Sequence, residues 1–178
     1  MESLQASARQ ETVDGYGTHK KVLKRAIELT IGPVLELGTG FHSTPLIHDL
    51  CAPKQRPVVS VDESEEWLQK FEQYRTDWHV MVRVPYTVNG QPDWNMVPYQ
   101  AARWGVALVD QHPTAGRLVS ISALADYCDL IVVHDTDCPT YYYEMLLKTF
   151  KYRFDYKSEM PYTTVVSNTM PFTMGGGA

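Results

Sequence analysis

Short apolar runs that alternate with helical segments constrain the fold of this chain most strongly. Strands are expected at 34–37, 57–61, 79–84, 106–109 and 130–133, and continuous Val, Ile and Leu dominate them. Such strands are buried on both faces, which is typical of parallel sheets. Helices are expected at 18–29, 43–50, 64–74 and 118–127, with Thr18 and Ser64 as candidate N-caps. The alternation predicts a doubly wound α/β sheet.

The last part of the chain breaks this alternation. After an expected helix at 140–150, strands are expected at 152–156 and 162–167, with five residues between them. A link this short cannot hold a crossover helix, so the two strands must form an antiparallel hairpin. The prediction is a seven-stranded, mostly parallel α/β sheet with a C-terminal antiparallel hairpin and helices on both faces.

Length and charge limit the classes of protein. The 178 residues fit one domain, which we place at 16–170, with an N-terminal arm at 1–15 and a flexible tail at 171–178. The formal net charge of −5 argues against a general nucleic-acid binder, which needs a basic face. No apolar run is long enough to span a membrane and the N-terminus has no apolar signal region, so a cytoplasmic protein is expected. The three cysteines form no CxxC pair and are expected as free thiols.

The turn after the first strand is the most informative motif. The sequence Glu36-Leu37-Gly38-Thr39-Gly40 places two glycines where the backbone turns tightly and can approach a ligand. Ligands of open α/β sheets bind beyond the carboxyl ends of the strands. Asp62 and Glu63 end the second strand, at the position that holds ribose hydroxyls in nucleotide-binding folds. The pattern therefore predicts a nucleotide-type ligand.

The dinucleotide fingerprint is incomplete in this turn. Ser43 stands where that fingerprint requires a third glycine, and Glu36 would repel a pyrophosphate. A ligand with an amino-acid end and no phosphate suits Glu36 better. This argument favours S-adenosylmethionine over a dinucleotide.

The segments 34–40 and 58–62 resemble the cofactor-binding core of class I S-adenosylmethionine-dependent methyltransferases. The closing hairpin is also typical of that family, so the resemblance covers about residues 16–168. It implies S-adenosylmethionine as the cofactor, with Glu36, Gly38 and Gly40 at the methionine end and Asp62 on the ribose. The full set of expected cofactor-binding residues is Glu36, Gly38, Thr39, Gly40, Ser43, Asp62, Glu63 and Asp110.

A second resemblance concerns the later strand ends. The segments 109–113, 116–117 and 133–135 are similar to the VD-x-P, GR and HD elements of a plant glycan 4-O-methyltransferase group. The segment 110–113 is not the Asn/Asp-Pro-Pro-aromatic motif of amino-group nucleobase methyltransferases. The third strand runs into Arg83-Val84-Pro85, which leaves the adenine contacts unassigned. The resemblance thus implies methyl transfer to an oxygen or nitrogen of a small molecule or glycan rather than a nucleic acid.

Asp110, His112 and Asp135 are the candidate catalytic residues. Asp110 and His112 follow the fourth strand, where the methyl group would point, and either could align the acceptor or take its proton. Asp110, His134, Asp135 and Asp137 could instead hold a divalent cation. Thr136 stands where a carboxamide would complete such a set, so we assign no metal ligand.

Several alternatives stay open at this point. Arg117 can bind a carboxylate or phosphate of the substrate, or pair locally. Residues 141–143, all tyrosines, can line the substrate pocket or join the core, and His19 can cover the cofactor or lie on the surface. The chain could also be a non-catalytic binding module or another nucleotide-dependent Rossmann enzyme, such as a dehydrogenase.

Overall fold

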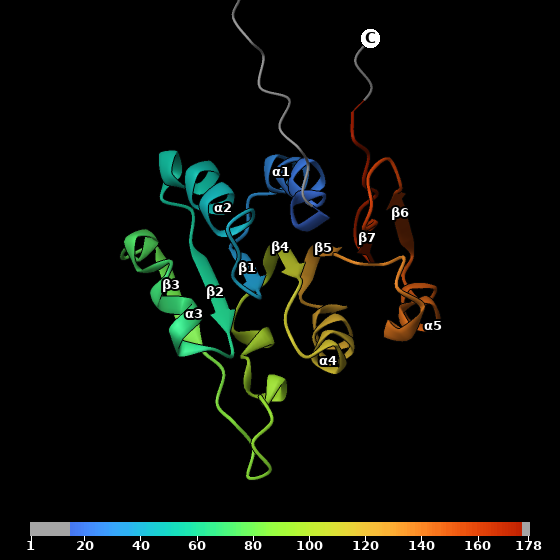
Figure 1. The fold of residues 1–178 in the computed structure, drawn as a ribbon. Helices are drawn as coiled ribbons and strands as arrows, with labels where there is room; N and C mark the ends of the chain where they lie inside the picture. The colour runs from blue at the N-terminus through green and yellow to red at the C-terminus, as the bar shows by residue number, and fades with distance from the viewer. Residues whose placement is uncertain (1–14, 176–178) are drawn as a thin grey trace, which may run out of the picture.

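The computed structural model describes residues 15–175, so residues 1–14 of the expected arm and 176–178 of the expected tail lie outside it. Figure 1 shows one sheet with helices on both faces. The strands are β1 (Val34–Leu37), β2 (Val58–Asp62), β3 (His79–Arg83), β4 (Trp104–Val109), β5 (Cys128–Val133), β6 (Tyr152–Tyr156) and β7 (Thr163–Ser167). The α-helices are α1 (Lys20–Leu29), α2 (Thr44–Cys51), α3 (Glu65–Gln69), α4 (Thr114–Leu124) and α5 (Tyr143–Leu147).

Short 3₁₀ turns connect these elements. They are η1 (Gly15–Gly17), η2 (Ala52–Lys54), η3 (Glu72–Tyr74), η4 (Trp94–Met96), η5 (Tyr99–Ala101) and η6 (Pro139–Tyr141). Within the described residues, no helix is both long and apolar enough to cross a membrane.

The seven strands lie in the order β3-β2-β1-β4-β5-β7-β6. Strands β1 to β5 are mutually parallel, and β7 is antiparallel to both β5 and β6. The predicted fold class is confirmed, including the C-terminal hairpin. The direction of winding reverses between the neighbours β1 and β4, and ligands of open α/β sheets bind at such a reversal.

Both faces of the sheet are buried because successive strand residues point in opposite directions. Val34 and Val106 pack under α1 and α2 in one apolar cluster, whereas Leu35, Leu37 and Val109 pack under α4 in the other. Figure 1 shows α1 and α2 on the opposite side of the sheet from α4. This arrangement explains the nearly continuous apolar runs of the sequence.

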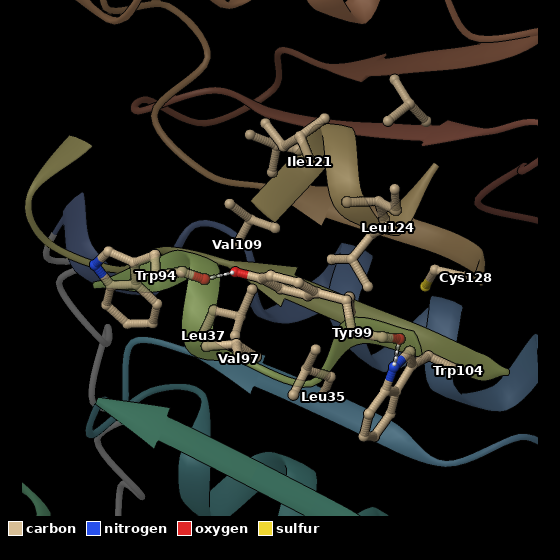
Figure 2. Packing of buried hydrophobic residues seen from close by; sticks show 14 of the residues in the cluster. Leu35, Leu37, Trp94, Val97, Tyr99, Trp104, Val109, Ile121, Leu124 and Cys128 are labelled. Carbon is tan, nitrogen blue, oxygen red and sulfur yellow. Dashed lines mark hydrogen bonds between the residues drawn. The ribbon is translucent and has the colours of Figure 1, made fainter. Parts of the chain in front are cut away.

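The segment between β3 and β4 covers the second face without a long helix. The structure has the two 3₁₀ turns η4 and η5 here. Trp94 and Tyr99 from these turns are buried, and the Tyr99 hydroxyl donates to the Trp94 carbonyl at 2.8 Å (Figure 2). The indole of Trp104 donates to the Tyr99 carbonyl at 2.8 Å. Trp94 also lies against α4 at Gly116, where a Cβ atom would come within 2.3 Å of the indole ring.

The ends of several helices differ from the predictions. Thr18 is not the N-cap of α1, which begins at Lys20, because its hydroxyl donates to the Pro161 carbonyl at 2.7 Å instead. Helix α4 begins at Thr114, four residues before the expected start, directly after Pro113. The expected helix at 140–150 is divided into η6 and α5 at Tyr142, which has a left-handed φ of 55°.

Two other local contacts involve Ser64 and Phe172. The Ser64 side chain accepts a hydrogen bond from the backbone N–H of Trp67, so it is the N-cap of α3 as predicted. Phe172 is buried, and its ring centroid lies 5.2 Å from that of Phe154. The packed part of the chain therefore includes Phe172.

Candidate functional site

A pocket of about 320 Å³ lies at the carboxyl ends of β1, β2 and β4. We call it the acidic pocket; its lining residues are Gly38, Thr39, Asp62, Glu63, Ser64, Trp67, Asp110 and His112. Its position is the one that the strand order indicates for a ligand, and its volume is at the lower end of the usual range for small-molecule sites. Six residues assigned from the sequence meet here. Glu36, Gly40, Ser43 and Asp135 are not among the lining residues.

The β1 turn, residues 38–40, forms one wall of the acidic pocket. Gly38 has φ +88°, and a Cβ atom there would lie 2.7 Å from the backbone of Asp110. Its N–H donates to the Val61 carbonyl at 2.8 Å, which ties the turn to β2. Gly40 is less restricted, because its Cβ position lies 3.2 Å from the Ser43 hydroxyl and its φ is not positive. The two glycines of the motif therefore have different roles.

Glu36 lies beneath the β1 turn with no exposed surface. It points to the face of the sheet that α2 covers, where Thr44 donates to its carboxylate at 2.9 Å and Ser60 at 2.5 Å. The Thr44 hydroxyl also accepts the Gly40 N–H at 3.0 Å. Burial raises the pKa of Glu36 to about 7, although these hydroxyls oppose the shift. Glu36 thus supports the turn from below, and direct contact with a cofactor stays a prediction.

A buried chain of hydrogen bonds continues from Glu36 toward the edge of the sheet. Because the Ser60 hydroxyl donates to Glu36, it accepts from His79 Nε2 at 2.9 Å, and His79 Nδ1 then accepts from His48 Nδ1 at 3.1 Å. Burial, followed by the neighbouring His48, lowers the pKa of His79 to about 4, so its ring is neutral. We did not predict this series of hydrogen bonds from the sequence. The available signal was a serine in β2 at the register position of Glu36.

Asp62 and Glu63 form the acidic wall of the pocket. The Asp62 carboxylate accepts bonds from the Thr39 N–H at 2.8 Å, the Thr39 hydroxyl at 2.9 Å and the Ser64 N–H at 3.0 Å. Glu63 is half-buried, and burial, followed by the charge of Asp62, raises its pKa to about 7. The protein thus fixes one carboxylate in place and keeps a second beside it.

A strand-end cluster of Asp110, Arg117, His134 and Asp135 lies at the ends of β4 and β5. Arg117 comes from α4 and is buried. Its guanidinium contacts Asp110 Oδ1 at 2.9 Å and Asp135 Oδ2 at 3.0 Å, and it donates to the Gln111 carbonyl at 2.7 Å. Of the two alternatives for Arg117, the structure has the local pairing. The tyrosines also divide: Tyr143 is buried, whereas Tyr142 is exposed.

His134 donates from both ring nitrogens in this cluster. Its Nδ1 lies 3.3 Å from Asp110 Oδ1 and 3.4 Å from Asp135 Oδ1. Its Nε2 lies 3.0 Å from the Thr18 hydroxyl, which gives its own proton to Pro161 and must therefore accept. Burial would lower the pKa of His134, but the hydrogen bond and charge of Asp110, with Asp135, outweigh it and raise the pKa. Both ring nitrogens of His134 therefore face oxygen atoms in this arrangement.

His19 lies beside His134 and is 2 % exposed, so it is not the surface residue that one alternative placed there. The two ring centroids are 4.7 Å apart in an edge-on arrangement. Neither nitrogen of His19 has a hydrogen-bond partner among the described residues. Burial, followed by the charge of His134, lowers the pKa of His19 to about 3, so its ring is neutral.

No protein-family model matches this chain, and no curated protein matches it. Solved structures are similar to it at low identity. An rRNA methylase from Streptococcus thermophilus is 11% identical, with a TM-score of 0.52 over 82% of this chain and 93% of that one. Precorrin-6y C5,15-methyltransferase from Geobacter metallireducens GS-15 is 10% identical, with a TM-score of 0.55 over 84% and 87%.

A third similar structure is M. capricolum TrmK in complex with S-adenosyl-homocysteine, which is 8% identical, with a TM-score of 0.50 over 85% of this chain and 70% of that one. Likenesses at such identities concern the arrangement of the elements and not the activity. Together with the strand order and the closing hairpin, they show that the chain has the fold of the class I S-adenosylmethionine-dependent methyltransferases.

Proposed function

We propose that this protein binds S-adenosylmethionine in the acidic pocket and transfers its methyl group to an oxygen or nitrogen atom. The observation that carries the proposal is the pocket itself, at the carboxyl ends of β1, β2 and β4, with Gly38, Asp62 and Asp110 in its walls. A structural neighbour, M. capricolum TrmK, is described as holding "the natural cofactor product S-adenosyl-homocysteine" in the same fold.

The lining residues offer a partner for each part of this cofactor. Gly38 of the β1 turn has no side chain, so its backbone lies in the pocket wall and is assigned to the amino-acid end. Asp62 and Glu63 accept hydrogen bonds from ribose hydroxyls. Trp67 also lines the pocket, and its ring packs edge-on against that of Phe41 with 5.5 Å between the centroids. We assign the adenine ring of the cofactor to this apolar wall.

The chemistry needs alignment of the acceptor and a place for its proton. When bound, S-adenosylmethionine supplies a methyl group on a positively charged sulfur. The carboxylate of Asp110, held by Arg117 at 2.9 Å, orients groups at the pocket and offsets positive charge there. His112 is exposed at the same wall and takes the proton that the acceptor loses.

We propose a small molecule or a glycan as the acceptor. Asp62, Glu63 and Asp110 make the pocket wall acidic, and the chain carries a net charge of −5. A phosphate backbone is bound by Lys and Arg, and an acidic wall repels it. Because one similar structure is an rRNA methylase, the experiment must include RNA among the acceptors.

Binding of S-adenosylhomocysteine tests the cofactor assignment. We expect millimolar ligand to raise the melting temperature, because it binds only the folded protein. By calorimetry, Asp62→Asn should bind it about 1–3 kcal/mol more weakly, roughly 5- to 150-fold, whereas Glu66→Gln on the exposed side of α3 should not differ. No stabilisation by this ligand, with stabilisation by NADH, would favour a dehydrogenase.

Transfer of labelled methyl groups tests the acceptor. We expect label to enter a phenol, amine or glycan from a mixed panel and not RNA of any structure. Label in RNA would overturn the acceptor class and leave the cofactor assignment standing. Tight cofactor binding without transfer to any member of the panel would favour the non-catalytic module.

A further inference from the structure

We propose that His19, Asp110 and His134 bind a divalent transition-metal ion of the kind that imidazole nitrogen favours, such as Zn²⁺. The three residues come from the segment before α1, the end of β4 and the end of β5. Each offers one donor atom, and these atoms lie within 4.8 Å of one another. The proposal goes beyond methyl transfer and does not depend on it.

His19 is the residue that calls for a ligand. Its side chain is buried, and neither ring nitrogen has a hydrogen-bond partner within residues 15–175. Buried polar atoms in folded proteins nearly always have a partner, so each exception needs an explanation. A neutral imidazole is also the commonest side-chain ligand of metal ions. An ion beside His19 would supply the missing partner.

The spacing of the other two donors suits one ion. Ligands at about 2.0–2.1 Å from a tetrahedral ion lie roughly 3.3–3.4 Å apart. His134 Nδ1 and Asp110 Oδ1 are 3.3 Å apart. The backbone N–H of His134 donates to the Val109 carbonyl at 3.2 Å, so both ligands stand on neighbouring central strands. The His19 donor atom lies within 4.8 Å of the other two donor atoms.

The surroundings of His134 also fit a metal ligand. Histidines that bind metals almost always donate their other ring N–H to an oxygen, which fixes the ring. His134 Nε2 donates to the Thr18 hydroxyl at 3.0 Å, which leaves Nδ1 toward Asp110. When the ion binds, it replaces the proton on Nδ1, which goes to solvent. Asp135 Oδ1, 3.4 Å from the same nitrogen, is available as a fourth ligand.

The donor set selects the class of ion. Two imidazole nitrogens and one carboxylate suit Zn²⁺, Co²⁺ or Ni²⁺, whereas Mg²⁺ and Ca²⁺ prefer oxygen alone. This site also differs from the set of Asp110, His134, Asp135 and Asp137 that the sequence left open. Asp137 is not part of it, because its carboxylate accepts the Tyr162 N–H at 2.8 Å. The proposed ion would lie next to the acidic pocket, since Asp110 belongs to both.

Metal titration of the chelator-treated protein tests the site. We expect one Zn²⁺ per chain by calorimetry and a rise in melting temperature. Co²⁺ should give the visible spectrum of a low-symmetry nitrogen and oxygen site. His19→Leu should bind at least 10-fold more weakly, and because leucine removes two unpartnered nitrogens it should fold without metal. The matched control is His48→Gln. His48 is hydrogen-bonded to His79, away from the proposed metal site, so this variant should bind Zn²⁺ as tightly as the wild type does.

Two results would overturn the proposal. One is equal Zn²⁺ affinity in the wild type and His19→Leu, and the other is no stoichiometric binding to the wild type together with no Co²⁺ spectrum. The Co²⁺ spectrum of the wild type decides the question even if His19→Leu does not fold. Binding of S-adenosylhomocysteine to the same metal-free sample is measured separately, so failure of the metal site is distinguishable from failure of the proposed cofactor site.

Discussion

The carboxyl group of Glu36 shows how one residue can serve a pocket that it does not line. Strand alternation turns its side chain to the face that α2 covers, and Thr44 connects it to the Gly40 N–H. The motif in the sequence indicated that this acid matters. It did not indicate that Thr44 and Ser60 hold the acid, because those partners come from elements that only the fold brings together.

The raised pKa of Glu36 predicts a pH-dependent stability. Burial raises this pKa from the ordinary value of 4.5 to about 7, so the folded chain holds the proton more tightly than the unfolded chain. The stability from this proton is complete below about pH 4.5 and is lost as the pH rises through about 7. In Glu36→Gln, the free energy of unfolding should therefore fall less between about pH 5 and pH 8 than in the wild type.

Urea unfolding across that pH range checks this prediction. The control is Glu28→Gln on α1, whose side chain is 44% exposed and which should keep the wild-type pH dependence. Equal pH dependence in Glu36→Gln and the wild type would show that Glu36 is charged in both the folded and the unfolded states.

The two glycines of the β1 turn make a matched pair of variants. Gly38→Ala requires a positive φ and brings a methyl group 2.7 Å from the Asp110 backbone, so it should destabilise the protein by about 1–3 kcal/mol or more. Gly40→Ala meets only the Ser43 hydroxyl at 3.2 Å and should cost less than about 1 kcal/mol. Urea unfolding of both variants checks the difference, and equal losses would contradict the geometry of the turn.

At the scale of elements, α4 is positioned by two neighbouring residues. Gly116 lets Trp94 pack against the helix, and Arg117 joins the ends of β4 and β5 through Asp110 and Asp135. The sequence resemblance marked this Gly-Arg pair but gave no reason for it. The reason is that a side chain at the first position would occupy the space of the indole, and the second position reaches the strand-end cluster.

Gly116→Ala tests this contact. Alanine favours a helix over glycine by up to about 1 kcal/mol, but its methyl group would lie 2.3 Å from the Trp94 ring. The overlap forces the indole or the helix to move, and we expect a net destabilisation of about 1–3 kcal/mol. Chemical denaturation measures it, with Ser122→Ala on the exposed side of α4 as the control. A stabilised Gly116→Ala would mean that Trp94 is displaced at little cost.

The elements also show what could be predicted from the sequence. All seven strands were expected close to where they are, because apolar runs and their acidic ends are local signals. The ends of α1 and α4 were not, because Thr18 bonds to Pro161 and Pro113 precedes an earlier start. The acidic pocket was largely predictable for the same reason as the strands, since carboxyl ends of parallel strands converge. The burial of His19 against His134 was not predictable, because the two residues lie more than a hundred positions apart in the sequence.

For the whole molecule, the two apolar clusters predict how its thiols react. Cys51 lies in one cluster and Cys128 in the other, both buried, whereas Cys138 is partly exposed. Burial also raises the pKa of Cys51 to about 11, which keeps it in the unreactive thiol form. A thiol reagent should therefore label one cysteine rapidly in the native protein and all three after unfolding. Mass spectrometry identifies the sites, and rapid native labelling of Cys51 or Cys128 would contradict this packing.

The place of β7 between β5 and β6 has a consequence for the chain as it leaves the ribosome. β5 ends at Val133 and its outer neighbour β7 begins at Thr163, so 163 − 133 = 30 residues of further translation separate them. At roughly 5–20 residues per second, the hydrogen-bonding edge of β5 waits for some seconds without its partner. β6 emerges earlier but is not adjacent to β5 in the finished order. The nascent chain therefore exposes a central strand to aggregation or chaperone binding until its final hairpin has been synthesised.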